Sequence, residues 1–242
     1  MMVQKEFRNK SIRAELVAAM RQGEFASCAH LPRESVLSEQ LGISRTQLRD
    51  ILASLEREGF ITRRHGVGTI INHHVLNVQV RMDIEVEFLD MIRQSGYTPA
   101  VESVRVQQEQ ADNRIARQLQ LCPGTPVLRV IRTCTADGKP AIYCEDVVEA
   151  CLVKGSYKDE DLQLPIFYFL QHYCGVQACQ DLTELHPVLA DEKLAQALRV
   201  PVGSPLLNME EVDYDIDNRP ILYSRQYYVD GIFHHTVLRK KL

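Results

Sequence analysis

The sequence predicts an α+β protein with an N-terminal winged helix-turn-helix and a C-terminal antiparallel sheet with helices. Residues 31–72 hold two short helical patterns, a turn, and two β-prone runs joined by a glycine-containing tip. From residue 85 onward, hairpin-forming runs alternate with short helical segments. The chain has 242 residues, of which 45% are hydrophobic and 25% charged, enough for two modest cores. We expect a winged helix-turn-helix domain over 1–74, a linker over 75–84 and a second domain over 85–242.

A recognition helix is predicted to begin at Arg45. Ser44 and Gln47 have capping-box spacing, in which the serine hydroxyl accepts a backbone N–H and the Gln47 side chain reaches back. Four residues then repeat at helical spacing and define an apolar face: Leu48, Ile51, Leu52 and Leu55. Arg45 and Arg49, one turn apart, lead the opposite face. Because arginine can donate two hydrogen bonds to guanine, this face suits the major groove of DNA.

The flanking segments predict a support helix and a wing. Leu31-Pro32 opens the support helix, Gly42 can take the left-handed conformation that ends it, and three residues are expected to pack inward: Val36, Leu37 and Leu41. Residues 60–64 and 69–71 are β-prone and are joined by the tip 65–68. Arg63, Arg64 and His65 are expected to meet phosphate or a minor groove. A solvated helix face is the alternative for Arg45 and Arg49, but the order of cap, helix, basic strand and tip favours DNA contact.

Charge is divided unevenly along the chain. Residues 1–74 hold 11 Lys and Arg against 8 Asp and Glu, a net charge of +3. Because the whole chain has a net charge of −4, residues 75–242 carry −7. Only the front third suits a polyanion. Because one small module seldom binds DNA tightly, two copies are implied, and we expect a homodimer.

Several classes of protein are disfavoured by composition. No apolar run reaches membrane-spanning length, and the polar start MMVQKEFRNK does not resemble a signal peptide. Seven cysteines, an odd number without a CxxC pair, predict reduced thiols and a cytoplasmic protein. The adjacent pairs His73-His74 and His234-His235 have no further ligands clustered nearby in the sequence. We therefore expect no membrane association, no metal and no cofactor.

The second domain is expected to contain one antiparallel sheet. Helices are predicted over 85–95, 112–121, 166–174 and 191–198, the last capped by Asp191. Strands are predicted over 101–107, 126–135, 141–149, 176–188, 205–214 and 220–229. Asp137-Gly138 marks a hairpin turn between the second and third strands. Two hairpins with helices between them indicate a single sheet.

The first third of the chain resembles the GntR family of bacterial regulators. The likeness rests on Leu31-Pro32, the stretch from Ser44 to Arg49 and the wing tip. It implies DNA contacts from the recognition helix and the wing by Ser44, Arg45, Thr46, Gln47, Arg49, His65 and Gly66. The family usually has arginine at Ser35 and glycine at Cys28, and the neighbouring Arg33 is a candidate replacement for the first contact.

The second domain resembles UTRA, the effector-sensing domain of the HutC subfamily of GntR regulators, whose fold is similar to chorismate lyase. The marks of the likeness are Gly96, the segment 132–140 around the first hairpin, the segment 198–206, and Asn218 to Asp230. The resemblance implies a small-molecule effector bound between the sheet and a helix.

Effector-binding residues follow from the resemblance position by position. The candidates are Arg132, Glu145, Tyr168, Ser224 and Tyr228. Sugar-phosphate-binding members often have Arg, Ser, Tyr and Glu where this chain has Cys134, Pro165, Phe167 and Leu222, which argues against an amino-sugar phosphate. Arg132, in a strand core position, requires an anion or a carboxylate, and an internal ion pair with Glu145 is the alternative to a ligand.

These patterns predict a homodimeric transcriptional repressor that is released from its double-stranded DNA operator by a small anionic effector, phosphorylated or carboxylated. A DNA-binding dimer without an effector is the main alternative. An enzyme of chorismate-lyase-like fold is disfavoured, because residues 85–242 show no nucleophile–base pair, metal spacing or phosphate loop.

Overall fold

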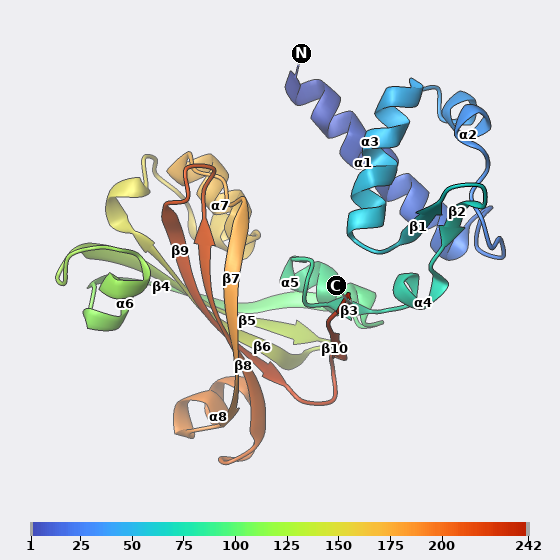
Figure 1. The fold of residues 1–242 in the computed structure, drawn as a ribbon. Coiled ribbons are helices and arrows are strands. Elements are labelled where there is room, and N and C mark those ends of the chain that lie inside the picture. The colour runs from blue at the N-terminus through green and yellow to red at the C-terminus, as the bar shows by residue number, and fades with distance from the viewer. Residues whose placement is uncertain (1, 241–242) are drawn as a thin grey trace. The chain divides into compact units, whose positions relative to one another are not determined.

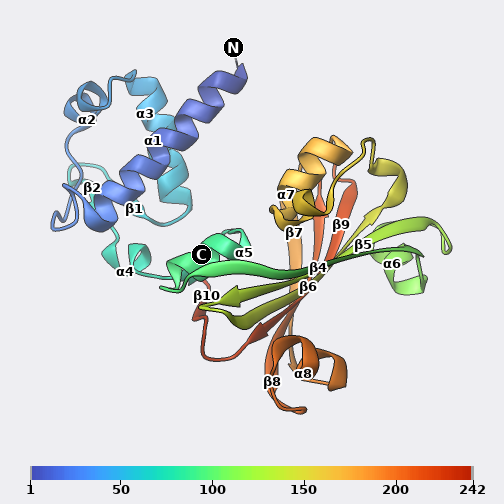
Figure 2. The same ribbon diagram turned by 180° about the vertical axis from the view of Figure 1, so that it is seen from behind.

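The computed structural model describes residues 2–240 and divides the chain into two compact units (Figures 1 and 2). One unit runs to Glu85 and includes the segment that starts at His235. The other spans Val86–His234. Each unit has its own hydrophobic core, as the sequence predicted for two modest domains.

The N-terminal unit is a winged helix-turn-helix. Its elements are α1 (Met2–Gln22), α2 (Glu34–Gln40), α3 (Arg45–Arg57), β1 (Ile61–Arg64), β2 (Gly68–Ile71) and α4 (His73–Leu76). Strands β1 and β2 pair antiparallel from Ile61↔Ile71 to Arg64↔Gly68. The support helix, recognition helix and wing therefore lie where the sequence predicted them.

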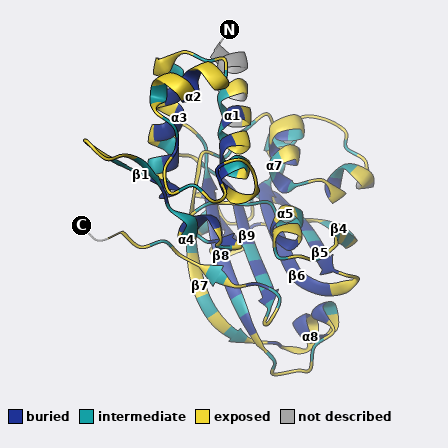
Figure 3. Ribbon diagram, turned by 90° about the vertical axis from the view of Figure 1, so that its right-hand side faces the viewer, coloured by how far each residue is buried: buried dark blue, intermediate teal, exposed yellow. Residues whose placement is uncertain are grey.

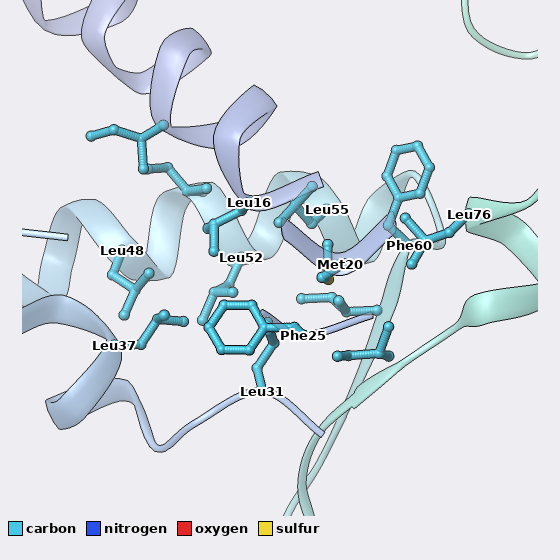
Figure 4. Close-up of a cluster of buried hydrophobic side chains, with 14 of the residues drawn as sticks. Leu16, Met20, Phe25, Leu31, Leu37, Leu48, Leu52, Leu55, Phe60 and Leu76 are labelled. Carbon is cyan, nitrogen blue, oxygen red and sulfur yellow. The ribbon is translucent and has the colours of Figure 1, made fainter. Parts of the chain in front are cut away.

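Helix α1 was not predicted from the sequence. It carries Ile12, Leu16 and Met20 at intervals of four residues, and all three are buried. They pack in the same core as Leu52 and Leu55 of α3 (Figure 4). Each fully buried leucine or methionine contributes roughly 1.5–3 kcal/mol through removal of apolar surface from water. The first helix is thus a main support of the recognition helix.

The segment 75–84, expected to be a linker, lies inside the N-terminal unit. Val75 and Leu76 are buried in its core. Strand β3 (Val80–Arg81) then pairs parallel with β10 (His235–Thr236), so the chain after His235 also belongs to this unit, and not to the second domain. His73, at the start of α4, is half-buried with its Nε2 2.8 Å from the Cys28 carbonyl oxygen.

The C-terminal unit contains one six-stranded antiparallel sheet. Its strands are β4 (Pro99–Gln110), β5 (Pro126–Ala136), β6 (Lys139–Glu149), β7 (Gln180–Leu189), β8 (Pro205–Tyr214) and β9 (Pro220–Val229). They lie in the order β4-β5-β6-β9-β8-β7. The helices are α5 (Phe88–Gln94), α6 (Asn113–Gln118), α7 (Ile166–Phe169) and α8 (Glu192–Leu198), with a π-helical turn over Leu170–Cys174 and 3-10 turns over Ala150–Leu152 and Asp159–Gln163. The single antiparallel sheet is confirmed.

Helices pack on both faces of this sheet. Leu128 and Val130 of β5 share a core with Phe169 of α7, whereas Val127 packs against α6 on the other face. Helix α8 also lies on that second face, against Tyr143. Burial is concentrated in the central strands (Figure 3). We call the two sides the Arg132 face and the Glu145 face, after the charged residue that each one buries.

A β-bulge in the β5–β6 hairpin sets which residues share a face. Pairing passes from Thr135↔Pro140 to Cys134↔Ile142, so Ala141 has no partner across the ladder. The shift places Arg132 opposite Cys144 and leaves Glu145 on the other face. Because side chains alternate between the two faces along a strand, one extra residue moves every later side chain of that strand to the opposite face.

Replacing Leu16 by alanine should lower the free energy of unfolding of the N-terminal unit by about 2–5 kcal/mol, since its side chain is 1% exposed and a cavity would remain. Urea unfolding followed by circular dichroism measures the change. Glu15→Ala, on the exposed side of the same helix, is the matched control and should shift stability by less than about 1 kcal/mol. Equal effects of the two substitutions would contradict the packing of α1.

Candidate DNA-binding surface and effector site

The start of α3 has the geometry of a capped recognition helix. The Ser44 hydroxyl accepts a hydrogen bond from the Gln47 backbone N–H at 3.1 Å. Leu48 and Leu52 are buried, which fixes the opposite face outward. Gly42 precedes the cap with φ +60°, the left-handed conformation expected at the end of α2. The sequence thus places the first turn of α3 at the surface of the unit.

The predicted DNA-contacting residues of α3 differ in how they are held. Arg45 and Thr46 are exposed. Arg49 is also exposed, and its Nε donates to Glu34 of α2 at 2.8 Å, which orients the guanidinium. Gln47 does not reach back to complete the capping box, because its side-chain amide donates to Asn9 of α1 at 2.7 Å. Gln47 is therefore held by α1.

Around α3, the support helix and the wing contribute further candidates. Arg33 is exposed at the start of α2. Val36, expected to pack inward, is 46% exposed. In the wing, Arg63 Nε donates to Glu56 of α3 at 2.8 Å, so this ion pair links the wing to the recognition helix. Arg64 is exposed, as are His65 and Gly66 at the tip, where Gly66 has φ +77°. The tip therefore presents Arg64 and His65 outward.

In the C-terminal unit, Arg132 organises a buried polar cluster on its face of the sheet. Its Nη2 donates to Asp146 Oδ2 at 2.7 Å and its Nη1 to the Leu164 carbonyl oxygen at 3.0 Å. The two side chains are 4% and 2% exposed. The ion pair is with Asp146 and not with Glu145, because of the bulge. Arg132 Nε is buried and has no hydrogen-bond partner within the described part of the chain.

Ser224 and Tyr228 belong to the same cluster. Ser224 donates to the other oxygen of Asp146 at 2.7 Å, and Tyr228 donates to Gln226 Oε1 at 2.6 Å. Phe88 of α5 covers the group: its ring lies 5.8 Å from the Arg132 guanidinium carbon and meets Tyr228 edge-on. The cluster combines one cation with polar and aromatic walls, a mixture typical of small-molecule sites.

Two predicted effector residues lie elsewhere. Glu145 is on the opposite face, where it contacts Arg129, Lys193 and Arg225. Tyr168 is 39% exposed and stacks on His172 with ring centroids 3.7 Å apart, outside the Arg132 cluster. Asp146 was not among the residues predicted from the sequence, because alternation along β6 places it on the Arg132 face only when the bulge is taken into account.

Several partly or fully buried groups near Arg132 have pKa values above their ordinary ones. Burial, together with the negative charge of Asp146, raises the pKa of Glu87 to about 7, although Arg132 opposes the shift. Burial likewise raises the pKa of the Cys134 thiol to about 11, so this position adds no charge. Gln226, which accepts from Tyr228, donates to Glu211, and burial together with the charge of Asp181 raises the pKa of Glu211 to about 7.

Two family models match the chain: bacterial regulatory proteins of the gntR family over residues 8–71, and the UTRA domain over residues 94–233. The chain belongs to the GntR family of transcriptional regulators. An HTH-type transcriptional regulator of Mycobacterium tuberculosis is 30% identical over 216 residues, covering 85% of this chain and 76% of that protein. The HTH-type transcriptional repressor NagR of Bacillus subtilis is 23% identical, covering 84% and 82%.

Among solved structures, the possible transcriptional regulator YydK of Bacillus subtilis superposes with a TM-score of 0.76 at 19% identity, covering 96% of this chain and 99% of that one. By these matches the protein is a DNA-binding transcriptional regulator with a UTRA effector-sensing domain. Among its described helices, none combines the length and apolarity needed to cross a bilayer.

Arg45→Ala or Arg49→Ala should weaken operator binding by about 1–3 kcal/mol, roughly fivefold to 150-fold, and should reduce its salt dependence if a phosphate contact is lost. Fluorescence anisotropy with labelled upstream DNA at two salt concentrations measures both effects. Arg57→Ala is the control, because it removes the same charge from the exposed far end of α3. The surface is assigned wrongly if all three variants bind like the wild type.

The stability of the C-terminal unit should fall as pH rises from about 4.5 to 7. A carboxyl whose folded pKa exceeds its unfolded value binds more protons when folded, so ionisation costs stability. Glu87→Gln should reduce this pH-dependent loss in the free energy of unfolding by on the order of 1–3 kcal/mol, and the loss due to Glu211 should remain. Urea unfolding from pH 4.5 to 8 tests this, and identical slopes for both proteins would refute the burial of Glu87.

Proposed function

We propose that this protein is a homodimeric, cytoplasmic repressor whose Arg132 cluster binds a small metabolite that releases it from DNA. The observation that carries the proposal is a buried arginine whose Nε lacks a partner within the described residues, beside the hydroxyls of Ser224 and Tyr228. An unpaired buried donor costs roughly 1–3 kcal/mol, which a ligand oxygen would recover. Similarity to a protein named a transcriptional repressor supports the direction of control.

The charge around Arg132 favours a carboxylate over a phosphate in the effector. Asp146 already neutralises the guanidinium, and Glu87 adds further negative charge above pH 7. A dianion would meet both carboxylates, whereas a monocarboxylate can accept from Arg132 Nε with one charge fewer. Phe88 and Tyr228 supply aromatic surface for the body of such a molecule. We therefore propose a carboxylate-bearing effector with an apolar or aromatic portion.

Release from DNA requires that the effector prefer the arrangement of the dimer that cannot bind both half-sites. A tenfold preference corresponds to about 1.4 kcal/mol. We propose the segment Val75–Asp83 as the route of transmission. Within it, Arg81 is 7% exposed and donates to the Glu58 carbonyl oxygen at 2.6 Å, so this segment is fastened to the end of α3. Lengthening the segment without an effect on induction would contradict this route.

The DNA contacts are proposed for Arg45, Thr46 and Arg49 of α3, with Ser44 as the cap that positions them. Arg33 and the tip residues His65 and Gly66 are proposed as flanking contacts. Two copies of this surface in a dimer would supply the affinity that one small module lacks.

A panel of aromatic and aliphatic carboxylates, with phosphate esters alongside, tests the proposed effector class by thermal shift. A bound carboxylate should raise the melting temperature and weaken operator binding in anisotropy. Tyr228→Phe should lower the affinity for that ligand by about twofold to tenfold, as expected for one lost hydrogen bond. Tyr168→Phe removes a hydroxyl outside the cluster and should change nothing. If no compound binds while DNA binding persists, the alternative of a dimer without an effector is favoured.

A further inference from the structure

A second candidate site lies on the Glu145 face, away from the proposed effector cluster. It is a cavity of about 590 Å³ between β4, β5, β6, β9 and α8. The alternation of side chains along β5 places Arg129, Ile131 and Thr133 in it, whereas Arg132 lies on the other face. Glu145 and Asp146 are adjacent in the chain, and the bulge places Asp146 on the face of Arg132 and Glu145 on the other face. We call this cavity the Glu145 groove.

Glu145 is the fixed centre of the groove. Its Oε1 accepts from Lys193 Nζ at 2.5 Å and from the Tyr143 hydroxyl at 3.0 Å. Its Oε2 accepts from Arg225 Nη2 at 2.5 Å and Arg129 Nη1 at 2.9 Å. Although burial opposes ionisation, the hydrogen bonds from Lys193 and Arg225 lower the pKa of Glu145 to about 2. One carboxylate thus holds cations from β5, β9 and α8 together.

The groove has more positive than negative charge. Its lining contains five cationic side chains, Arg105, Arg129, Lys193, Arg199 and Arg225, and three carboxylates, Glu102, Glu109 and Glu145. Arg199 pairs with Glu102 at 2.5 Å and Arg129 with Glu109 at 2.6 Å. The excess of two positive charges therefore resides on the side chains that share Glu145 and on Arg105.

Two of the five cations are largely shielded from water, whereas Lys193, Arg199 and Arg105 are exposed. The side chains of Arg129 and Arg225 are only 14% and 26% exposed. Each guanidinium has five N–H donors, of which one donates to Glu145. Holding surplus positive charge partly away from water is unfavourable unless an anion compensates it. Fork-shaped guanidinium groups beside an ammonium also match the oxygens of phosphate and carboxylate.

We propose that the Glu145 groove binds a small organic dianion, a phosphate monoester or a dicarboxylate. Two negative charges would neutralise the excess, and the volume lies within the range of roughly 300–1,000 Å³ found for ligand cavities. Lys193 of α8 and Arg105 of β4 both line the cavity, so both contact the ligand in this proposal. Binding here is independent of the Arg132 cluster and of the effector proposed for it.

Isothermal titration of the full-length protein at constant ionic strength tests the groove. Glycerol 3-phosphate and succinate are the two dianion probes, and glycerol and acetate are their uncharged and singly charged counterparts. At least one dianion should bind, and the arm that binds identifies the source of the charge. Lys193→Gln and Arg105→Gln should each weaken that binding about tenfold. Lys139→Gln, exposed at the β5–β6 turn, removes the same charge outside the groove and should have no effect.

Three results would overturn the proposal. The first is that neither dianion binds. The second is that Tyr228→Phe, on the Arg132 face, abolishes dianion binding while Lys193→Gln leaves it intact, which would assign the ligand to the other cluster. The third is that Lys193→Gln alters the dimer dissociation constant in sedimentation but not ligand affinity, which would make the groove an interface between copies of the chain.

Discussion

The pairing register of β5 with β6 determines which charged residues of the C-terminal unit can meet. Ala141 lies in a bulge, and without it Arg132 would face Tyr143 and share a face with Glu145. With it, Arg132 meets Asp146 on one face while Glu145 gathers Arg129, Arg225 and Lys193 on the other. A buried charge without its partner is costly, so both clusters depend on this single extra residue.

The division of charge gives the two faces different chemistry. The Arg132 face has a guanidinium already neutralised by Asp146 and surrounded by aromatic rings, so it suits a ligand of low charge. The Glu145 face retains an excess of positive charge around a cavity. In the N-terminal unit, Glu34 similarly orients Arg49, and Glu56 restrains Arg63. In each unit, acidic partners decide which arginines remain available.

Local signals predicted most of the elements. The Ser44 and Asp191 caps, the left-handed Gly42 and the Asp137-Gly138 turn lie as expected, because each is specified by one or two residues. Helix α1 was missed because its short apolar stripe lies among polar residues, and the pairing of Gln47 with Asn9 was missed with it. The bulge, and with it the placement of Glu145, has no comparable local signature. Tertiary packing decides the pairing register. The strands were therefore easier to predict than the face of the sheet on which each side chain lies.

A double-mutant cycle on Arg132 tests this account most directly, with the free energy of unfolding of the full-length protein as the readout. The cycle with Asp146, built from Arg132→Met and Asp146→Asn, should give a coupling energy above about 1 kcal/mol, because each single variant leaves a buried partner unpaired. The cycle that combines Arg132→Met with Glu145→Gln should give a coupling near zero. A large coupling to Glu145 and none to Asp146 would mean that the bulge is absent and that the two charged faces are assigned wrongly.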